Sequence, residues 1–273
     1  MHNAGKAGRA PLSGSGSPPV MPPFKINHER SMMMMFVFAH RGASGYAPEN
    51  TMAAFRKAVD MGCDGIELDI QQTKDGRLVI IHDENVKRTT NGSGYVADCT
   101  YEELCKLDAG SWFHSDFAKE RLPLLDDYLD AIADTGLMTN IEIKNVPFFY
   151  KGIEQKLIQA LSSRGMLDRV IVSSFDHYAL ATIAELEPRI KLGVLFGDRL
   201  FEPANYIRSL PFPVYSVHPH FSFANEAFIS ACHDIGSKVY AYTVDRPEWA
   251  VALRSAGIDG IFSNVPNYVK VGI

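Results

Sequence analysis

The sequence has few cysteines and no excess of basic residues. Four cysteines occur among 273 residues, and none forms a C-x-x-C pair, a density far below that of disulfide-stapled secreted domains. The formal net charge is −5 at pH 7, whereas proteins that follow a nucleic-acid backbone or an anionic membrane carry basic surfaces. We therefore expect a protein of a reducing compartment, the cytoplasm, with no nucleic-acid partner.

Long apolar runs are also missing. Residues 32–38 form an apolar run of seven residues, well short of the roughly 20 that span a bilayer. No small-residue cleavage site follows this run, so we interpret it as the start of the core and expect no stable membrane insertion. The preceding chain is rich in Gly, Pro and Ser, and residues 1–35 are predicted to be a disordered arm or an expression remnant.

From residue 36 onward, short β-branched or aromatic runs alternate with helical stretches. This alternation is typical of βα units around a parallel sheet. The predicted fold is a (β/α)8 TIM barrel in one catalytic domain, residues 36–273; an open doubly wound sheet is the alternative, but its Gly-rich dinucleotide fingerprint is absent. The eight predicted strands cover residues 36–39, 65–70, 139–143, 170–173, 190–195, 214–217, 238–243 and 260–262.

One segment interrupts the alternation. Residues 83–122 contain the Gly-rich turn 91–94 and a short helix that a Thr100/Glu103 capping box would open. We predict that this segment is a small insertion after the second strand of the barrel.

Charged side chains lie near the carboxyl ends of the predicted strands, where TIM barrels carry their active sites. Glu67 and Asp69 are two residues apart, as are Glu142 and Lys144, and strand residues with this spacing share a face. Three carboxylates at one barrel mouth repel each other unless a cation lies among them, and oxygen ligands suit Mg²⁺ or Ca²⁺. We predict such a divalent cation; ion pairing with Lys144 or Arg41 is the alternative.

Two histidines also fall at predicted strand ends. His40 follows the first strand, and His82 follows the extended run 78–81. Imidazole gives and takes protons near neutral pH, and Arg41 and Lys144 would offset negative charge. This combination favours a site for a phosphate ester.

These residues lie in runs that resemble the signatures of the glycerophosphodiester phosphodiesterase family, in its bacterial cytoplasmic form. The resemblance spans roughly residues 36–268. The runs are HRGASGYAPENT at 40–51, ELD at 67–69, TKDG at 73–76, HD at 82–83, RTTNGSG at 88–94, IEIK at 141–144 and GIDGIF at 257–262.

The resemblance implies a barrel with a small insertion after strand two. It also implies a metal-dependent hydrolase that cuts glycerophosphodiesters, which are deacylated phospholipids, into glycerol 3-phosphate and an alcohol. The implied metal ligands are Glu67, Asp69 and Glu142. The implied acid and base are His40 and His82, and the implied phosphate contacts are Arg41 and Lys144.

The chain departs from the family pattern at two places. Tyr242 stands where many members have Trp, and Ser263-Asn264 replaces a common Thr-Asp. Both departures bear on the shape of the substrate pocket, and Tyr242 is predicted to contact the substrate. Near the first signature, Asn50 and Thr51 are interpreted as helix caps, and Glu49 as a residue that orients a His or Arg.

Two further functions are compatible with these residues. A lysophospholipase D would use the same apparatus but needs an apolar groove for an acyl chain. Candidates for that groove are Phe196, Phe201, Phe212, Phe221 and Phe223. A non-catalytic barrel that binds phosphorylated ligands would have lost a histidine or a metal carboxylate, and none is missing.

Overall fold

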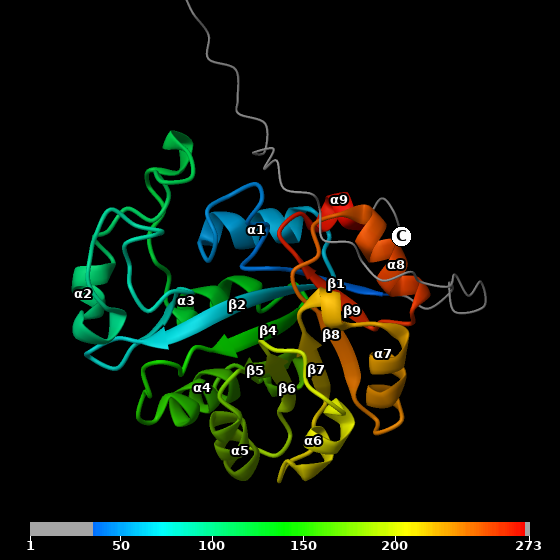
Figure 1. Cartoon of the computed structure of the whole chain (residues 1–273). Helices are drawn as coiled ribbons and strands as arrows, with labels where there is room; N and C mark the ends of the chain where they lie inside the picture. The colour runs from blue at the N-terminus through cyan, green and yellow to red at the C-terminus, as the bar shows by residue number, and fades with distance from the viewer. Residues whose placement is uncertain (1–34, 271–273) are drawn as a thin grey trace, which may run out of the picture.

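The computed structural model describes residues 35–270, and in these residues eight parallel strands close into a barrel ringed by helices (Figure 1). The pairing of β1 with both β2 and β9 closes the sheet. This architecture confirms the predicted TIM barrel. The arm predicted for residues 1–35 lies outside the described residues except for Met35, which is buried.

The barrel strands agree with the predicted ones to within a few residues. They are β1 (Phe36–Ala39), β2 (Gly65–Gln72), β4 (Met138–Ile143), β5 (Val170–Ser174), β6 (Lys191–Phe196), β7 (Ser216–Pro219), β8 (Lys238–Ala241) and β9 (Gly260–Ser263). Strand β8 ends before Tyr242, which instead forms an isolated bridge with His220.

Helices follow the strands and cover the outside of the barrel (Figure 1). They are α1 (Met52–Asp60), α3 (Leu125–Ile132), α4 (Ile153–Ser162), α5 (His177–Leu186), α6 (Pro203–Ser209), α7 (Glu226–His233), α8 (Pro247–Ser255) and α9 (Pro266–Lys270). Short 3-10 turns precede β5 at Leu167–Arg169 and α7 at Phe221–Phe223. No helix within the described range is both long and apolar enough to cross a bilayer.

Alternation along β2 decides which side chains face the barrel interior. Ile66, Leu68 and Ile70 are buried in the main apolar cluster together with helix residues such as Phe55 and Tyr128. Because successive strand residues point to opposite faces, the intervening acidic residues of β2 point into the barrel.

The segment after β2 has a core of its own. Strand β3 (Leu78–Ile80) pairs antiparallel with β2, and the following chain holds the short helix α2 (Tyr101–Leu104) and 3-10 turns at Val96–Asp98 and Ser115–Phe117. The capping box that opens α2 is present. The buried residues of this separate cluster are Val79, Ile81, Val86, Val96, Leu104, Ala109 and Leu122. The predicted insertion after strand two is thereby confirmed.

Candidate active site

Three carboxylates from two neighbouring strands meet at the barrel mouth. Glu67 and Asp69 come from β2 and Glu142 from β4, and one oxygen of each lies within 4.8 Å of the others. Oxygens bound to one Ca²⁺ lie about 2.3–2.6 Å from the ion, so separations of up to about 5 Å fit a shared cation. Burial and the carboxylates of Asp69 and Glu142 raise the pKa of Glu67 well above its ordinary value, a repulsion that a cation would offset.

Asp69 has one oxygen anchored and one without a hydrogen bond. Its Oδ2 accepts a bond of 2.9 Å from Asn50 Nδ2 and lies 3.4 Å from Arg41 Nε. Its Oδ1 is buried without a hydrogen-bond partner, 3.9 Å from the Lys144 ammonium. Burial alone would raise the pKa of Asp69, but Arg41, His82 and Lys144 hold it well below the ordinary range. The carboxylate is therefore ionised and has an oxygen available to a ligand.

Two cationic side chains flank the triad. The guanidinium of Arg41 donates to Glu49 at 2.8 Å, and the Arg41 backbone N–H donates to Glu67 at 2.8 Å. The ammonium of Lys144 donates to Glu142 at 2.7 Å. Positive groups on either side of a carboxylate cluster suit a ligand that carries a phosphate.

His40 is held by an uncharged partner. Its Nδ1 lies 2.7 Å from Oδ1 of Asn264, the residue that follows β9. Burial, followed by the nearby charge of Arg41, lowers the pKa of His40 to about 4. The imidazole is therefore neutral near pH 7.

His82 has a charged partner instead. Its Nδ1 lies 2.7 Å from Oδ1 of Asp83, and its Nε2 lies 3.1 Å from Lys144 Nζ. A hydrogen bond from Arg88 is the largest cause that lowers the pKa of Asp83, to about 2. The Nδ1 of His82 thus contacts a carboxylate, whereas the Nδ1 of His40 contacts an amide oxygen, so the two histidines have different electrostatic surroundings.

Arg88 joins the two sides of the site. Its guanidinium donates to Glu49 at 2.7 and 2.8 Å and to Asp83 at 2.6 and 2.9 Å. Glu49 also accepts from Arg41, and Asp83 contacts His82. Arg88, a residue of the insertion, thus holds both Glu49, which pairs with Arg41, and Asp83, which contacts His82.

A cavity of about 330 Å³ opens onto these groups. The predicted site residues in its lining are His40, Arg41, Glu67, His82, Glu142, Lys144 and Tyr242. The hydroxyl of Tyr242 donates to the Phe196 carbonyl at 2.6 Å, and the Tyr242 ring lies edge-on to Phe175 with ring centroids 6.3 Å apart. Tyr242 is therefore a fixed wall of the cavity, and its contact with substrate stays a prediction.

A model of the glycerophosphoryl diester phosphodiesterase family matches residues 40–268. The chain belongs to this family. It is 46% identical over 244 residues to the glycerophosphodiester phosphodiesterase of Caldanaerobacter subterraneus subsp. tengcongensis, and the match covers 88% of this chain and 100% of the relative. It is 41% identical to the glycerophosphodiester phosphodiesterase of Bacillus altitudinis, with 86% and 96% covered.

Solved structures agree with this assignment. A phosphodiesterase of Oleispira antarctica, solved in complex with the product sn-glycerol-3-phosphate, superimposes with a TM-score of 0.80 at 31% identity, covering 89% of this chain and 97% of that one. The predicted family and the prediction that the chain is an enzyme, a glycerophosphodiester phosphodiesterase, are confirmed.

The structure of this phosphodiesterase adds contacts that the sequence pattern did not assign. Asn50, predicted to cap a helix, contacts Asp69 instead, whereas Thr51 caps α1. Glu49 orients Arg41, as expected. The support from Arg88 was missed, although Arg88 opens the family-like run 88–94.

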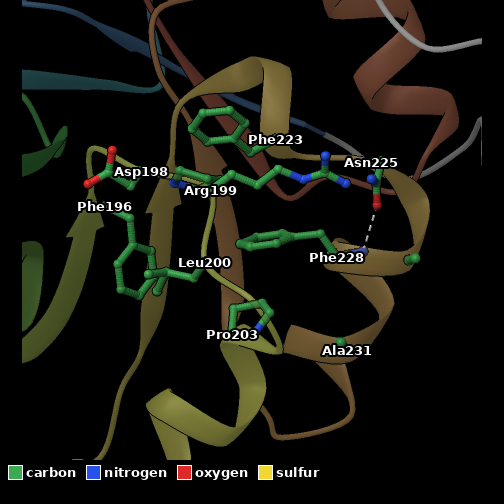
Figure 2. Close-up of a pocket in the computed structure, with 11 residues that line it drawn as sticks. Phe196, Asp198, Arg199, Leu200, Pro203, Phe223, Asn225, Phe228 and Ala231 are labelled. Atoms are coloured by element: carbon green, nitrogen blue, oxygen red, sulfur yellow. Dashed lines mark hydrogen bonds between the residues drawn. The ribbon is translucent and has the colours of Figure 1, made fainter.

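A second cavity has a volume of about 240 Å³ (Figure 2). Phe196, Leu200, Phe223 and Phe228 line it between the β6–α6 loop and α7. Leu195 lines the first cavity and Phe196 the second, and because successive strand residues point to opposite faces, β6 lies between the two cavities.

Two of the five phenylalanines predicted for an acyl groove line the second cavity. Phe196 and Phe223 line the cavity. Phe212 and Phe221 are instead buried in the main apolar cluster, and Phe201 is 91% exposed. Two of the five predicted residues therefore line a cavity, which Asp198, Arg199 and Asn225 also line.

Proposed function

We propose that this phosphodiesterase hydrolyses glycerophosphodiesters to glycerol 3-phosphate and an alcohol with the help of a divalent cation. The observation that carries the proposal is a cluster of three buried carboxylates, two of which line one cavity together with two cationic groups and two histidines. The product sn-glycerol-3-phosphate bound by the Oleispira antarctica relative supports this substrate class.

Glu67, Asp69 and Glu142 would hold Mg²⁺ or Ca²⁺ in this proposal. The donor set fits a hard cation because all three ligands are carboxylates, and because Asp69 Oδ1 is buried without a hydrogen bond. When bound, the cation supplies charge neutralisation and polarisation of a phosphoryl oxygen. Arg41 and Lys144, on opposite sides of Asp69, would bind the remaining phosphoryl oxygens.

The surroundings of the two histidines support different roles. His40 is half-buried and neutral, and its Nδ1 contacts an amide oxygen, so it would accept a proton from the attacking hydroxyl group. The Nδ1 of His82 contacts the carboxylate of Asp83, which orients the ring, and we assign to His82 the donation of a proton to the departing alcohol. A phosphodiester bound by Lys144 would draw that ammonium away from His82 Nε2.

The test of the proposed function is a screen of purified protein against glycerophosphocholine, glycerophosphoethanolamine and lysophosphatidylcholine, with and without added Mg²⁺ or Ca²⁺. We expect metal-dependent release of glycerol 3-phosphate from the first two substrates. Failure to cleave either glycerophosphodiester in any metal would reject the proposal.

The second cavity favours one alternative, a lysophospholipase D. Phe196, Leu200 and Phe228 would supply apolar contacts for an acyl chain (Figure 2), which would have to pass the end of β6 to reach them from the candidate site. Cleavage of lysophosphatidylcholine at a rate above that of glycerophosphocholine would support this alternative, whereas no cleavage would leave the cavity without this role.

Loss of Arg88 is expected to slow turnover without loss of the fold. Arg88→Ala removes four hydrogen bonds to Glu49 and Asp83, so both Arg41 and His82 lose the support of their partners. Removal of such supporting contacts typically costs about 10- to 100-fold in activity. The measurement is kcat and KM for glycerophosphocholine, together with the melting temperature.

The matched control is Arg121→Ala. Arg121 also lies in the segment between β3 and α3, but its side chain donates only to the carbonyls of Ala118 and Glu120. Near-normal kcat in Arg88→Ala, or an equal loss in Arg121→Ala, would contradict a positioning role for Arg88.

A further inference from the structure

Asn264 and Asp245 form a chain of hydrogen bonds behind His40. We propose that Asp245 is a positioning residue that fixes the amide orientation of Asn264, and through it the tautomer of His40. This inference rests on the proposed role of His40 as the base. It concerns a position at which the chain departs from the common Thr-Asp of the family, Ser263-Asn264.

The orientation of the Asn264 amide follows from Asp245. Asn264 Nδ2 lies 2.7 Å from Asp245 Oδ2, and an ionised carboxylate can only accept hydrogen bonds. The NH₂ group must therefore face Asp245, and the amide oxygen must face His40. Ser44 Oγ lies 2.8 Å from Asn264 Oδ1 and 2.7 Å from the His40 carbonyl, and its single proton can serve only one of them, so Asp245 decides the orientation.

Asp245 is itself fixed by the end of β9. Its Oδ1 accepts from the backbone N–H of Asn264 at 2.8 Å and from Ser263 Oγ at 3.1 Å. Both oxygens of Asp245 are thus engaged, and the carboxylate cannot turn without breaking contacts to two residues.

The tautomer of His40 follows from the amide oxygen. Because Asn264 Oδ1 can only accept, the Nδ1 that lies 2.7 Å away must carry the proton. In a neutral ring Nε2 then has a free lone pair, which is the state that a general base requires. The charged groups that act on this ring are Arg41, Asp69 and Asp245.

Asp245→Asn is the variant that tests the chain of contacts. The amide oxygen introduced at position 245 would still accept from the backbone N–H of Asn264 and from Ser263 Oγ. The NH₂ group introduced at position 245 would then face the side-chain NH₂ group of Asn264, and two donors repel each other. Asn264 would then turn its own NH₂ toward His40 and favour the tautomer with the proton on Nε2. We expect kcat to fall on the order of 10²-fold, less than the ~10⁴-fold loss documented for a catalytic histidine in the wrong tautomer.

The exchanged variant Asp245→Asn/Asn264→Asp provides the rescue. The amide introduced at position 245 can donate to the carboxylate introduced at position 264, which again accepts from His40 Nδ1. We expect most of the lost kcat to return. The acid limb of kcat/KM should move to higher pH by about one to three units, because a carboxylate at Nδ1 stabilises the protonated ring and raises the pKa of the base.

Nitrogen-15 chemical shifts of the His40 ring report the tautomer directly and can be assigned with the His40→Gln variant. We expect a proton on Nδ1 in the wild type and in the exchanged variant, and on Nε2 in Asp245→Asn. The control Asp130→Asn makes the same chemical change at an exposed carboxylate that pairs with Arg164, so its shifts and kcat should stay near those of the wild type.

An unchanged His40 tautomer together with unchanged kcat in Asp245→Asn would overturn the inference, as would an exchanged variant no more active than Asp245→Asn. The proposed function fails separately. Near-normal turnover in His40→Ala would remove the base assignment, whereas the nitrogen shifts test the action of Asp245 on the ring without any substrate.

Discussion

Exhaustive removal of divalent cations is expected to abolish glycerophosphodiester turnover, and added Mg²⁺ or Ca²⁺ to restore it. The buried oxygens of Glu67, Asp69 and Glu142 lie within 4.8 Å of one another, and a cation among them would stabilise transition-state charge by several kcal/mol. The expected loss is on the order of 10³-fold or more in kcat/KM. The measurement is turnover of glycerophosphocholine with metal analysis of the chelated protein.

Glu67→Gln separates the metal role from a structural role. In metal-free protein this change should not lower the melting temperature, because it removes a carboxylate from a repelling cluster. A cation at 100 times its Kd stabilises a folded protein by about 2.7 kcal/mol, and Glu67→Gln should lose most of this response. Asp130→Asn, at an exposed carboxylate that pairs with Arg164, is the control and should keep it. Full activity of the demonstrably metal-free enzyme would refute the ligand assignment.

Replacement of either histidine is expected to remove most of the activity while the barrel stays folded. General acid or base catalysis typically contributes 10²- to 10⁴-fold, so His40→Ala and His82→Ala should each lose about that factor in kcat. Both variants should keep the stabilisation by added metal, because neither histidine is an assigned ligand. A variant with near-normal kcat would exclude that histidine from proton transfer.

A good leaving group distinguishes the acid from the base. A substrate that releases p-nitrophenol needs little protonation of the departing oxygen, so His82→Ala should cleave it at nearly the wild-type rate. His40→Ala should remain slow with the same substrate. The opposite pattern would show that the roles are reversed.

The barrel could be predicted from sequence because alternation is a local property. Runs such as 65–70 and 139–143 alternate inward and outward residues, and the structure places β2 and β4 there. The end of β8 was less predictable. Tyr242 continues the apolar pattern, but it forms an isolated parallel bridge with His220, which follows the neighbouring strand β7, and no local pattern encodes such a contact.

The candidate site could likewise be predicted from the sequence only in part. Glu67, Asp69, Glu142 and Lys144 could be predicted to converge because spacing along a strand decides the face. The contacts that support these residues could not be predicted. Arg88 reaches Glu49 across 39 positions of the chain, through a loop whose path is set by its own apolar cluster.

The contact between His40 and Asn264 spans 224 positions, so the first and last strands of the barrel must both be in place before it forms. Chains are made from the N-terminus at about 5–20 residues per second. On the ribosome, the carboxylates of β2 and β4 emerge well before β9 does. The contact that orients His40 forms only after β9 has been made, so the candidate site is incomplete in a nascent chain until the barrel closes.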